Sequence, residues 1–178
     1  MNVTVFGSSK PTPGEALYQQ AYQLGQALAC NKHTVLTGGY IGTMEAVSRG
    51  AAEAGGHVIG VTCDEIEKWR TVGANPWVKE DRHVATLHER IIALIDGCQA
   101  AIALPGGIGT LTEIMLMWNR KLITAIPAKP LILLGDGWFS VIRALRNYQP
   151  DYFSHSDLQL IHFASDTEGA LALINTIQ

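Results

Sequence analysis

Short apolar segments alternate with amphipathic ones along this chain of 178 residues, and the alternation limits the fold more than any other feature. The apolar segments lie at 3–6, 33–37, 57–62, 100–104 and 130–135. Most segments between them carry apolar residues every three or four positions, which is typical of helices packed on one side. Strands that are apolar throughout occur in parallel sheets with helices on both faces. We therefore predict an α/β fold of this kind, formed as a single domain by residues 1–178.

Some later regions are less regular. Residues 64–80 have no clear period and are predicted to form a long surface loop that has room for one helical turn. A loop of this length in a compact domain is often a lid or part of a binding site. A weak strand is predicted at 82–86, and a last strand and helix at 158–164 and 165–177.

Charge and hydropathy restrict the partners of the chain. Hydrophobic residues make up 47% of it and charged residues 16%, as in compact globular proteins. The net charge is −3 and there is no basic run, so binding to nucleic acid or to a membrane surface is not expected. No apolar run is long enough to span a bilayer. A local pocket for one small anion is compatible with this composition.

The cysteines and histidines indicate neither a disulfide framework nor a metal site. Cys30, Cys63 and Cys98 are odd in number and have no CxxC spacing, which favours a reducing environment. The first ten residues contain no charged leader and no long apolar stretch, so no signal peptide is expected. The six histidines have no metal-ligand spacing. We therefore predict a cytoplasmic protein without a bound metal.

Glycine-rich turns follow several of the predicted strands. Gly7 and Ser8 follow the first strand, Gly38 and Gly39 the second, and Pro105–Gly107 the strand at 100–104. The carboxyl ends of parallel strands lie at one edge of the sheet, where α/β proteins bind their ligands. These turns are therefore predicted to meet at one binding site.

The turn at 105–110 has the features of a phosphate site. Gly106, Gly107 and Gly109 leave no side chain in the way of a ligand, and a helix beginning near Thr110 offers free N–H groups and a partial positive charge. Such helix ends bind phosphate. The alternative is a tight turn in which glycine is required for packing. No GK[ST] follows, so the turn is not a P-loop.

Glu113 has two interpretations. Thr110 and Glu113 have the spacing of a capping box, in which the glutamate only completes a helix N-terminus. The same spacing occurs at Thr12 and Glu15, Thr86 and Glu89, and Ser165 and Glu168. Alternatively, an acid one turn into a helix whose N-terminus holds phosphate lies near the bound sugar. The spacing leaves both interpretations open.

Arg90 also has two interpretations. In the predicted helix 87–96 it lies on or beside the apolar face that contains Leu87, Ile91 and Leu94. An arginine at such a position needs a partner. It is either an edge residue whose guanidinium reaches water, or a positive charge directed into an anion pocket.

Four motifs of this chain resemble the LONELY GUY (LOG) family, and the resemblance extends over nearly the whole chain. "PGGIGTLTE" (105–113) matches the family motif PGGxGTxxE. "VFGSS" (5–9), "TGGYIGTMEAVSRGA" (37–51) and "LHERIIALI" (87–95) resemble the family's other site segments. Members of this family hydrolyse the N-glycosidic bond of a nucleoside 5′-monophosphate to a free base and ribose 5-phosphate.

The resemblance implies a Rossmann-like three-layer sandwich that forms a homodimer or a higher homo-oligomer. It also implies that Gly107, Gly109 and Thr110 hold the 5′-phosphate and that Arg90 and Glu113 are the catalytic pair. A carboxylate near the ribose stabilises the positive charge that develops on the sugar and orients water. No cofactor is needed for this reaction.

The chain departs from the plant-type motifs at several positions. Ile91 stands where those enzymes carry a lysine after the arginine, and Thr112 replaces the first of two successive glutamates. The second glycine-rich segment also differs, at Thr37, Thr43 and Glu45. These forms are closer to a less characterised bacterial branch. Three functions remain as expectations. They are hydrolysis of a purine nucleoside 5′-monophosphate, non-catalytic nucleotide binding or carriage on the same fold, and an enzyme reaction on a sugar phosphate or another anion.

Overall fold

Parallel strands form the centre of this computed structural model, which describes residues 1–176. Within that range seven strands form one sheet in the order β4-β3-β2-β1-β5-β6-β7, and all neighbours are parallel. The strands are β1 (Asn2–Phe6), β2 (Thr34–Thr37), β3 (Val58–Cys63), β4 (Glu80–Val84), β5 (Ala100–Ala103), β6 (Leu131–Leu134) and β7 (His162–Ala164). The predicted α/β fold with a parallel sheet is confirmed.

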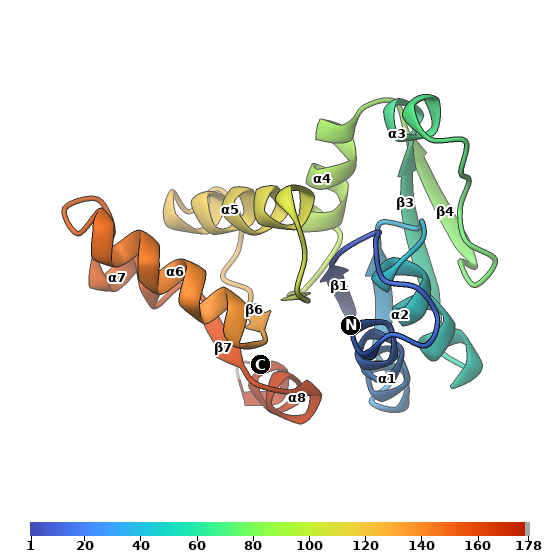
Figure 1. Cartoon of the computed structure of the whole chain (residues 1–178), viewed down its shortest axis with the longest axis horizontal. Helices are drawn as coiled ribbons and strands as arrows, with labels where there is room; N and C mark the ends of the chain where they lie inside the picture. Colours follow the sequence, from blue (N-terminus) through green and yellow to red (C-terminus); the bar gives the residue numbers. More distant parts are fainter. Residues whose placement is uncertain (177–178) are drawn as a thin grey trace.

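Helices cover both faces of this sheet (Figure 1). They are α1 (Ala16–Cys30), α2 (Thr43–Glu53), α3 (Asp64–Trp69), α4 (Leu87–Asp96), α5 (Ile108–Leu122), α6 (Asp136–Tyr148), α7 (His155–Leu158) and α8 (Thr167–Thr176). One apolar core joins α1, α2 and α8 to the sheet, and a second joins α4, α5 and α6 to its other face. The arrangement is therefore a Rossmann-like three-layer sandwich. None of the helices within residues 1–176 is long and apolar enough to cross a membrane.

The strand order creates a crevice beside β1. From β1 the chain moves outward through β2 and β3 to the edge strand β4, and then returns to β5 on the other side of β1. The loops that leave β1 and β5 therefore diverge, and such a switch point is where open α/β sheets bind ligands. The turns at Gly7 and at Pro105–Gly107 flank this crevice.

The structure confirms one of the predicted helix caps in the N-terminal half and contradicts another. The box at Thr86 and Glu89 is confirmed: the Glu89 amide donates to Thr86 Oγ1 at 3.2 Å, and the Thr86 amide donates to Glu89 Oε2 at 3.0 Å. The predicted N-cap at Thr12 is wrong, because α1 begins only at Ala16. Gly14 has a φ of +98°, a left-handed conformation that interrupts a helix at that point.

The C-terminal part differs more from the prediction. Ser165 is not the cap of α8, because Asp166 Oδ1 accepts the Gly169 amide at 2.8 Å and the helix begins at Thr167. The predicted strand 158–164 is wrong in its first half, where α7 ends. Ser154 and Asp157 form a capping box that starts α7 and leaves only His162–Ala164 for β7. Residue 177 of the predicted last helix lies outside the described residues.

The segment at 64–80 is more regular than predicted. Its first six residues form α3, directly after β3, and its last residue already belongs to β4. The strand predicted at 82–86 begins and ends two residues earlier, at Glu80–Val84. β4 is mostly exposed and pairs with β3 alone, which explains its weak apolar pattern.

Candidate functional site

A cavity of about 570 Å³ opens at the switch point beside β1. Five segments of the chain line it. They contribute residues 7–10, Tyr40, Ile41 and Met44, then Glu65, Ile66, Trp69, Arg70 and Val72, then Leu87, Arg90 and Ile91, and finally 107–110, Thr112 and Glu113. Turns that are far apart in the sequence therefore meet here, as the strand-end argument predicts.

Arg90 lies at the floor of this cavity and is almost fully buried. Its Nε donates to the Val61 carbonyl oxygen at 2.7 Å, and its Nη2 donates to the Gly38 carbonyl oxygen at 3.0 Å. The Arg90 guanidinium also lies 5.4 Å from the centre of the Tyr40 ring. The interpretation of Arg90 as an edge residue that reaches water is therefore wrong, because the side chain is bound to the ends of β2 and β3.

Glu113 faces Arg90 from the neighbouring helix. Arg90 Nη1 and Glu113 Oε1 are 3.9 Å apart, and the two side chains are only 6% and 10% exposed. Burial raises the pKa of the Glu113 carboxyl to about 7, while the charge of Arg90 acts in the opposite direction. A carboxyl with this pKa can take or give a proton near neutral pH, as a general acid or base must.

The capping interpretation of Glu113 is wrong. Helix α5 begins at Ile108 with Gly107 as its N-cap, so Thr110 and Glu113 are already inside the helix. Glu113 shares the buried face of α5 with Thr110, Ile114, Met117 and Trp118. That spacing of three and four residues was present in the sequence and is the signal that places Glu113 on the inner face.

The N-terminus of α5 forms a polar end of the cavity. A Cβ atom built on Gly107 or Gly109 would meet nothing within 4 Å, so packing does not require glycine at either position. At Gly106, by contrast, a Cβ atom would lie 2.1 Å from Thr110 Oγ1. Among the described residues no side chain caps α5. Its first amides, which lack partners within the helix, are therefore left open to the cavity side.

The loop that follows β1 lies close to this polar end. Gly7 and Ser8 both line the cavity. The Ser8 carbonyl oxygen accepts the Thr43 amide at 2.8 Å and the Thr43 hydroxyl at 3.1 Å. A Cβ atom on Gly7 would come within 2.2 Å of Thr43 Oγ1, so glycine is required for this close approach to the start of α2.

Three of the predicted site residues lie outside the cavity wall. Gly38 supports Arg90 from behind, and a Cβ atom on it would lie 1.7 Å from Arg90 Nη2. The carbonyl oxygen of Gly39 accepts the backbone and side-chain amides of Asn75 at 2.7 and 3.0 Å. Gly106 lines a separate, shallow hollow next to Pro105.

Sequence reasoning did not name several residues of the cavity wall. Lys10 and Arg70 bring positive charge to it, and Trp69 brings a large aromatic surface. Arg70 Nη1 donates to Ser9 Oγ at 3.0 Å. Trp69 and Arg70 belong to the region predicted as a lid or part of a binding site, so the length of that irregular segment was their only signal.

Comparison with known proteins places the chain in a family. A profile of the SLOG cluster4 family matches residues 1–143. The chain belongs to the SLOG cluster4 family. The matched range contains every residue that lines the cavity.

Curated relatives of this SLOG chain confirm the resemblance to the LOG family. The probable cytokinin riboside 5′-monophosphate phosphoribohydrolase LOGL9 of Oryza sativa subsp. japonica is 34% identical over 146 residues, which are 80% of this chain and 62% of the rice protein. The chain thus spans about three-fifths of that relative. The cytokinin riboside 5′-monophosphate phosphoribohydrolase of Rhodococcoides fascians is 29% identical. The matched region covers 98% of this chain and 89% of that protein.

Solved structures with the same fold include proteins that are named for another ligand, the molybdenum cofactor. The molybdenum cofactor binding protein of Rippkaea orientalis has a TM-score of 0.77 and 28% identity, over 99% of this chain and 96% of that one. The molybdenum cofactor carrier protein of Chlamydomonas reinhardtii has a TM-score of 0.75 at 24% identity, which shows a common fold. The SLOG fold of this chain is thus shared by phosphoribohydrolases and by cofactor-binding proteins.

Proposed function

We propose that this protein hydrolyses the N-glycosidic bond of a purine nucleoside 5′-monophosphate, releasing the free base and ribose 5-phosphate. The observation that carries the proposal is the buried Arg90–Glu113 pair at the floor of the cavity. The relatives named as cytokinin riboside 5′-monophosphate phosphoribohydrolases support the same reaction class.

The polar end of the cavity fits the 5′-phosphate of such a substrate. In the proposed complex the phosphate lies at the N-terminus of α5, against Gly107, Gly109 and Thr110, with Gly7 and Ser8 on the other side. Open amides and the helix dipole favour an anion there. The side-chain-free surface at Gly107 and Gly109 lets the phosphate approach the backbone closely.

Glu113 performs the chemical step in this proposal. The bond between ribose C1′ and the base nitrogen breaks, and positive charge develops on the sugar. The Glu113 carboxylate stabilises this charge and accepts a proton from the water whose oxygen bonds to C1′, while the departing base takes up a proton from solvent. The raised pKa of Glu113 suits it to hold that proton transiently.

In this proposal Arg90 holds Glu113 in position and favours its ionised form. Arg90 does not bind the phosphate. Two of its guanidinium nitrogens already donate to the carbonyl oxygens of Val61 and Gly38. The third, Nη1, faces Glu113. Its positive charge favours the ionised carboxylate, which is the form that accepts a proton.

A homodimer is part of the proposed assembly. Ile108 is 86% exposed and Leu87 is 42% exposed, although both line the cavity. Ile123, at the other end of α5, is 63% exposed. A second copy packed on this face would cover these apolar side chains. Light scattering coupled to size exclusion should give twice the chain mass, and Ile123→Lys should reduce it toward the monomer.

A second candidate function is the binding and carriage of a phosphate-bearing small molecule without turnover. The similarity to the Rippkaea orientalis molybdenum cofactor binding protein along nearly the whole of both chains favours it. Thr112 also stands in the place of a family glutamate and is exposed at the cavity wall. In that case the same glycines bind the phosphate and Glu113 carries out no reaction.

Incubation of the pure protein with AMP and other nucleoside 5′-monophosphates, followed by chromatography of the free base, tests the two functions. Base release that is lost in Glu113→Gln and kept in Glu168→Gln supports the hydrolase. Glu168 is a matched control because it lies in α8, outside the cavity. The absence of base release, together with thermal stabilisation by the same nucleotides, supports the carrier.

A further inference from the structure

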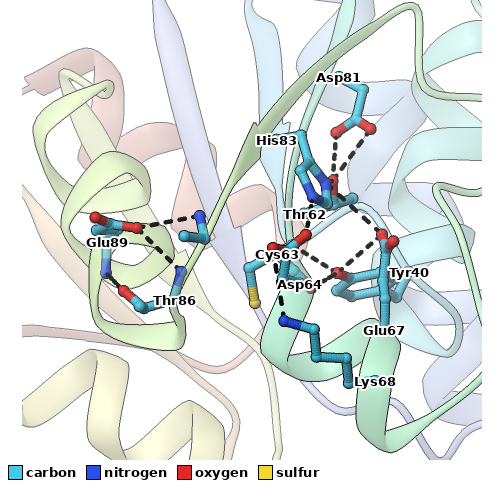
Figure 2. Close-up of polar contacts among 11 residues, drawn as sticks. Tyr40, Thr62, Cys63, Asp64, Glu67, Lys68, Asp81, His83, Thr86 and Glu89 are labelled. Carbon is cyan, nitrogen blue, oxygen red and sulfur yellow. Dashed lines mark hydrogen bonds and ion pairs between the residues drawn. The ribbon is translucent and has the colours of Figure 1, made fainter.

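Helix α3 lies beside the cavity as a surface segment, called here the α3 arm, and polar contacts hold this arm in place. None of its six residues is buried. At its base, His83 Nε2 of β4 lies 2.7 Å from Asp64 Oδ1, and the Tyr40 hydroxyl accepts the Cys63 amide at 2.7 Å (Figure 2). Tyr40 also donates to Glu67 Oε1 at 3.4 Å. These contacts fix the start of the arm to the ends of β2, β3 and β4.

The end of this arm presents an aromatic side chain to the cavity. Trp69 is 72% exposed and lines the cavity wall. The Arg70 guanidinium lies 4.2 Å from the centre of the Trp69 ring. Within residues 1–176 the Trp69 ring makes no other ring or cation contact. An indole on an arm with no buried residue contributes little to the core, so its position needs another explanation.

Arg70 connects this aromatic surface to the polar end of the cavity. Its Nη1 donates to Ser9 Oγ, 61 positions away in the sequence, in the loop that follows β1. Ser8 and Lys10, which flank Ser9, also line the cavity. The wall near Trp69 is apolar, with Ile66, Val72 and Leu87. The cavity wall thus offers a surface that suits a planar apolar group beside a polar part that suits an anion.

We propose that the Trp69 indole stacks on the purine base of the bound nucleotide and determines the preference of the site for an aromatic ring. This inference rests on the proposed function for the identity of the ring, but it concerns binding and does not require turnover. Stacking on tryptophan tolerates different bases, because every base has a π face. Arg70 braces the indole through its contact with the ring and its hydrogen bond to Ser9.

Binding of AMP and of ribose 5-phosphate, measured by calorimetry in the Glu113→Gln background, tests this role. Trp69→Ala should weaken AMP binding about tenfold or more and leave ribose 5-phosphate binding unchanged. Trp69→Phe should retain most of the affinity for AMP. Trp77→Ala is the matched control, because Trp77 also lies over an arginine, Arg49, but outside the cavity. It should bind AMP like the parent.

Fluorescence provides a second readout. AMP should quench the tryptophan emission of the parent protein, and this quenching should disappear in Trp69→Phe. Equal AMP affinity in Trp69→Ala and Trp77→Ala overturns the inference, as does an equal loss for AMP and ribose 5-phosphate. Failure of AMP to bind the parent overturns it too. A Trp69-dependent preference for AMP without any base release in the wild-type protein leaves the inference intact and rejects the hydrolase.

Discussion

The floor and the rim of the cavity are built in different ways. At the floor, Arg90 and Glu113 are buried and face each other, and Arg90 donates to the backbone carbonyl oxygens of Val61 in β3 and of Gly38 just after β2. At the rim, Trp69 ends helix α3, which has no buried residue, and Arg70 follows it. This helix is held by side-chain contacts such as that between His83 and Asp64. The floor is therefore fixed by the core of the fold, whereas the rim can change without disturbing it. In this chain, substitutions at the rim are therefore expected to alter binding without disturbing the core.

The largest effect is expected at the floor. Glu113→Gln should lower base release by at least about 100-fold, because proton transfer by a positioned side chain typically contributes that much. Glu168→Gln, in α8 and outside the cavity, should keep most of the activity. Both rates can be measured by chromatography of the free base. Equal rates in the two variants would remove Glu113 from the mechanism.

Gly38→Ala tests whether the floor depends on backbone packing. A Cβ atom at this position would overlap Arg90 Nη2, so the guanidinium must move away from the Gly38 carbonyl oxygen. We expect a loss of about 1–3 kcal/mol in the free energy of unfolding, with a matching fall in activity. Gly137→Ala is the control, since a Cβ atom there would meet nothing within 4 Å. Denaturant unfolding of both variants measures the difference, and equal stabilities would contradict this account of Arg90.

The pKa of Glu113 makes the stability of the floor depend on pH. Because burial raises this pKa from 4.5 to about 7 in the folded state, the stabilising contribution of the neutral acid is complete below pH 4.5 and is lost as the pH rises through 7. Glu113→Gln should therefore gain stability relative to the wild type between pH 5 and pH 8.5, by up to about 3 kcal/mol. Thermal unfolding at both pH values measures this gain. A difference that does not change with pH would show that Glu113 ionises normally.

The catalytic pH profile should follow the same group. If the carboxylate is the active form, base release rises with pH through about 7, the pKa of Glu113. Arg90→Gln removes the charge that favours ionisation, so the rise should move to higher pH. Initial rates from pH 5 to pH 9 locate the midpoint. If the midpoint of the pH–rate profile is the same in Arg90→Gln as in the wild type, Arg90 is not the group that favours ionisation of Glu113.

The rim should show a smaller effect, and its ion pair, like the contribution of neutral Glu113 at the floor, is lost as the pH rises. The hydrogen bond to Asp64 raises the pKa of His83 above its ordinary value. The ion pair is therefore fully present below about pH 6.5 and is lost as the pH rises through the raised pKa. Asp64→Asn should raise the KM for the nucleotide by less than about fivefold, because exposed pairs contribute little, and leave kcat unchanged. A change in kcat would mean that the contact between Asp64 and His83 also affects the chemical step at Glu113.

Much of the fold was predictable from the sequence because it follows from local periodicity. Apolar strands between amphipathic helices indicate a parallel sheet, and the glycine turns at strand ends indicate where a ligand binds. The segments that were predicted wrongly, at α7 and at the caps of α1 and α8, depend on which of several neighbouring polar residues begins the helix. Local spacing does not separate such alternatives.

The sequence by itself predicted that the glycine turns, including 105–110, meet at one edge of an α/β sheet, and the family resemblance added Arg90 and Glu113 to that site. Only the tertiary structure decided where each of them lies and what it contacts there. A capping glutamate and a buried acid on the inner face of a helix have the same spacing, and the start of α5 at Ile108 separates the two. The partners of Arg90 come from β2 and β3, so no local pattern contains them. The exposure of Trp69 beside the cavity likewise depends on where α3 is anchored, because contacts between distant segments set both burial and charge.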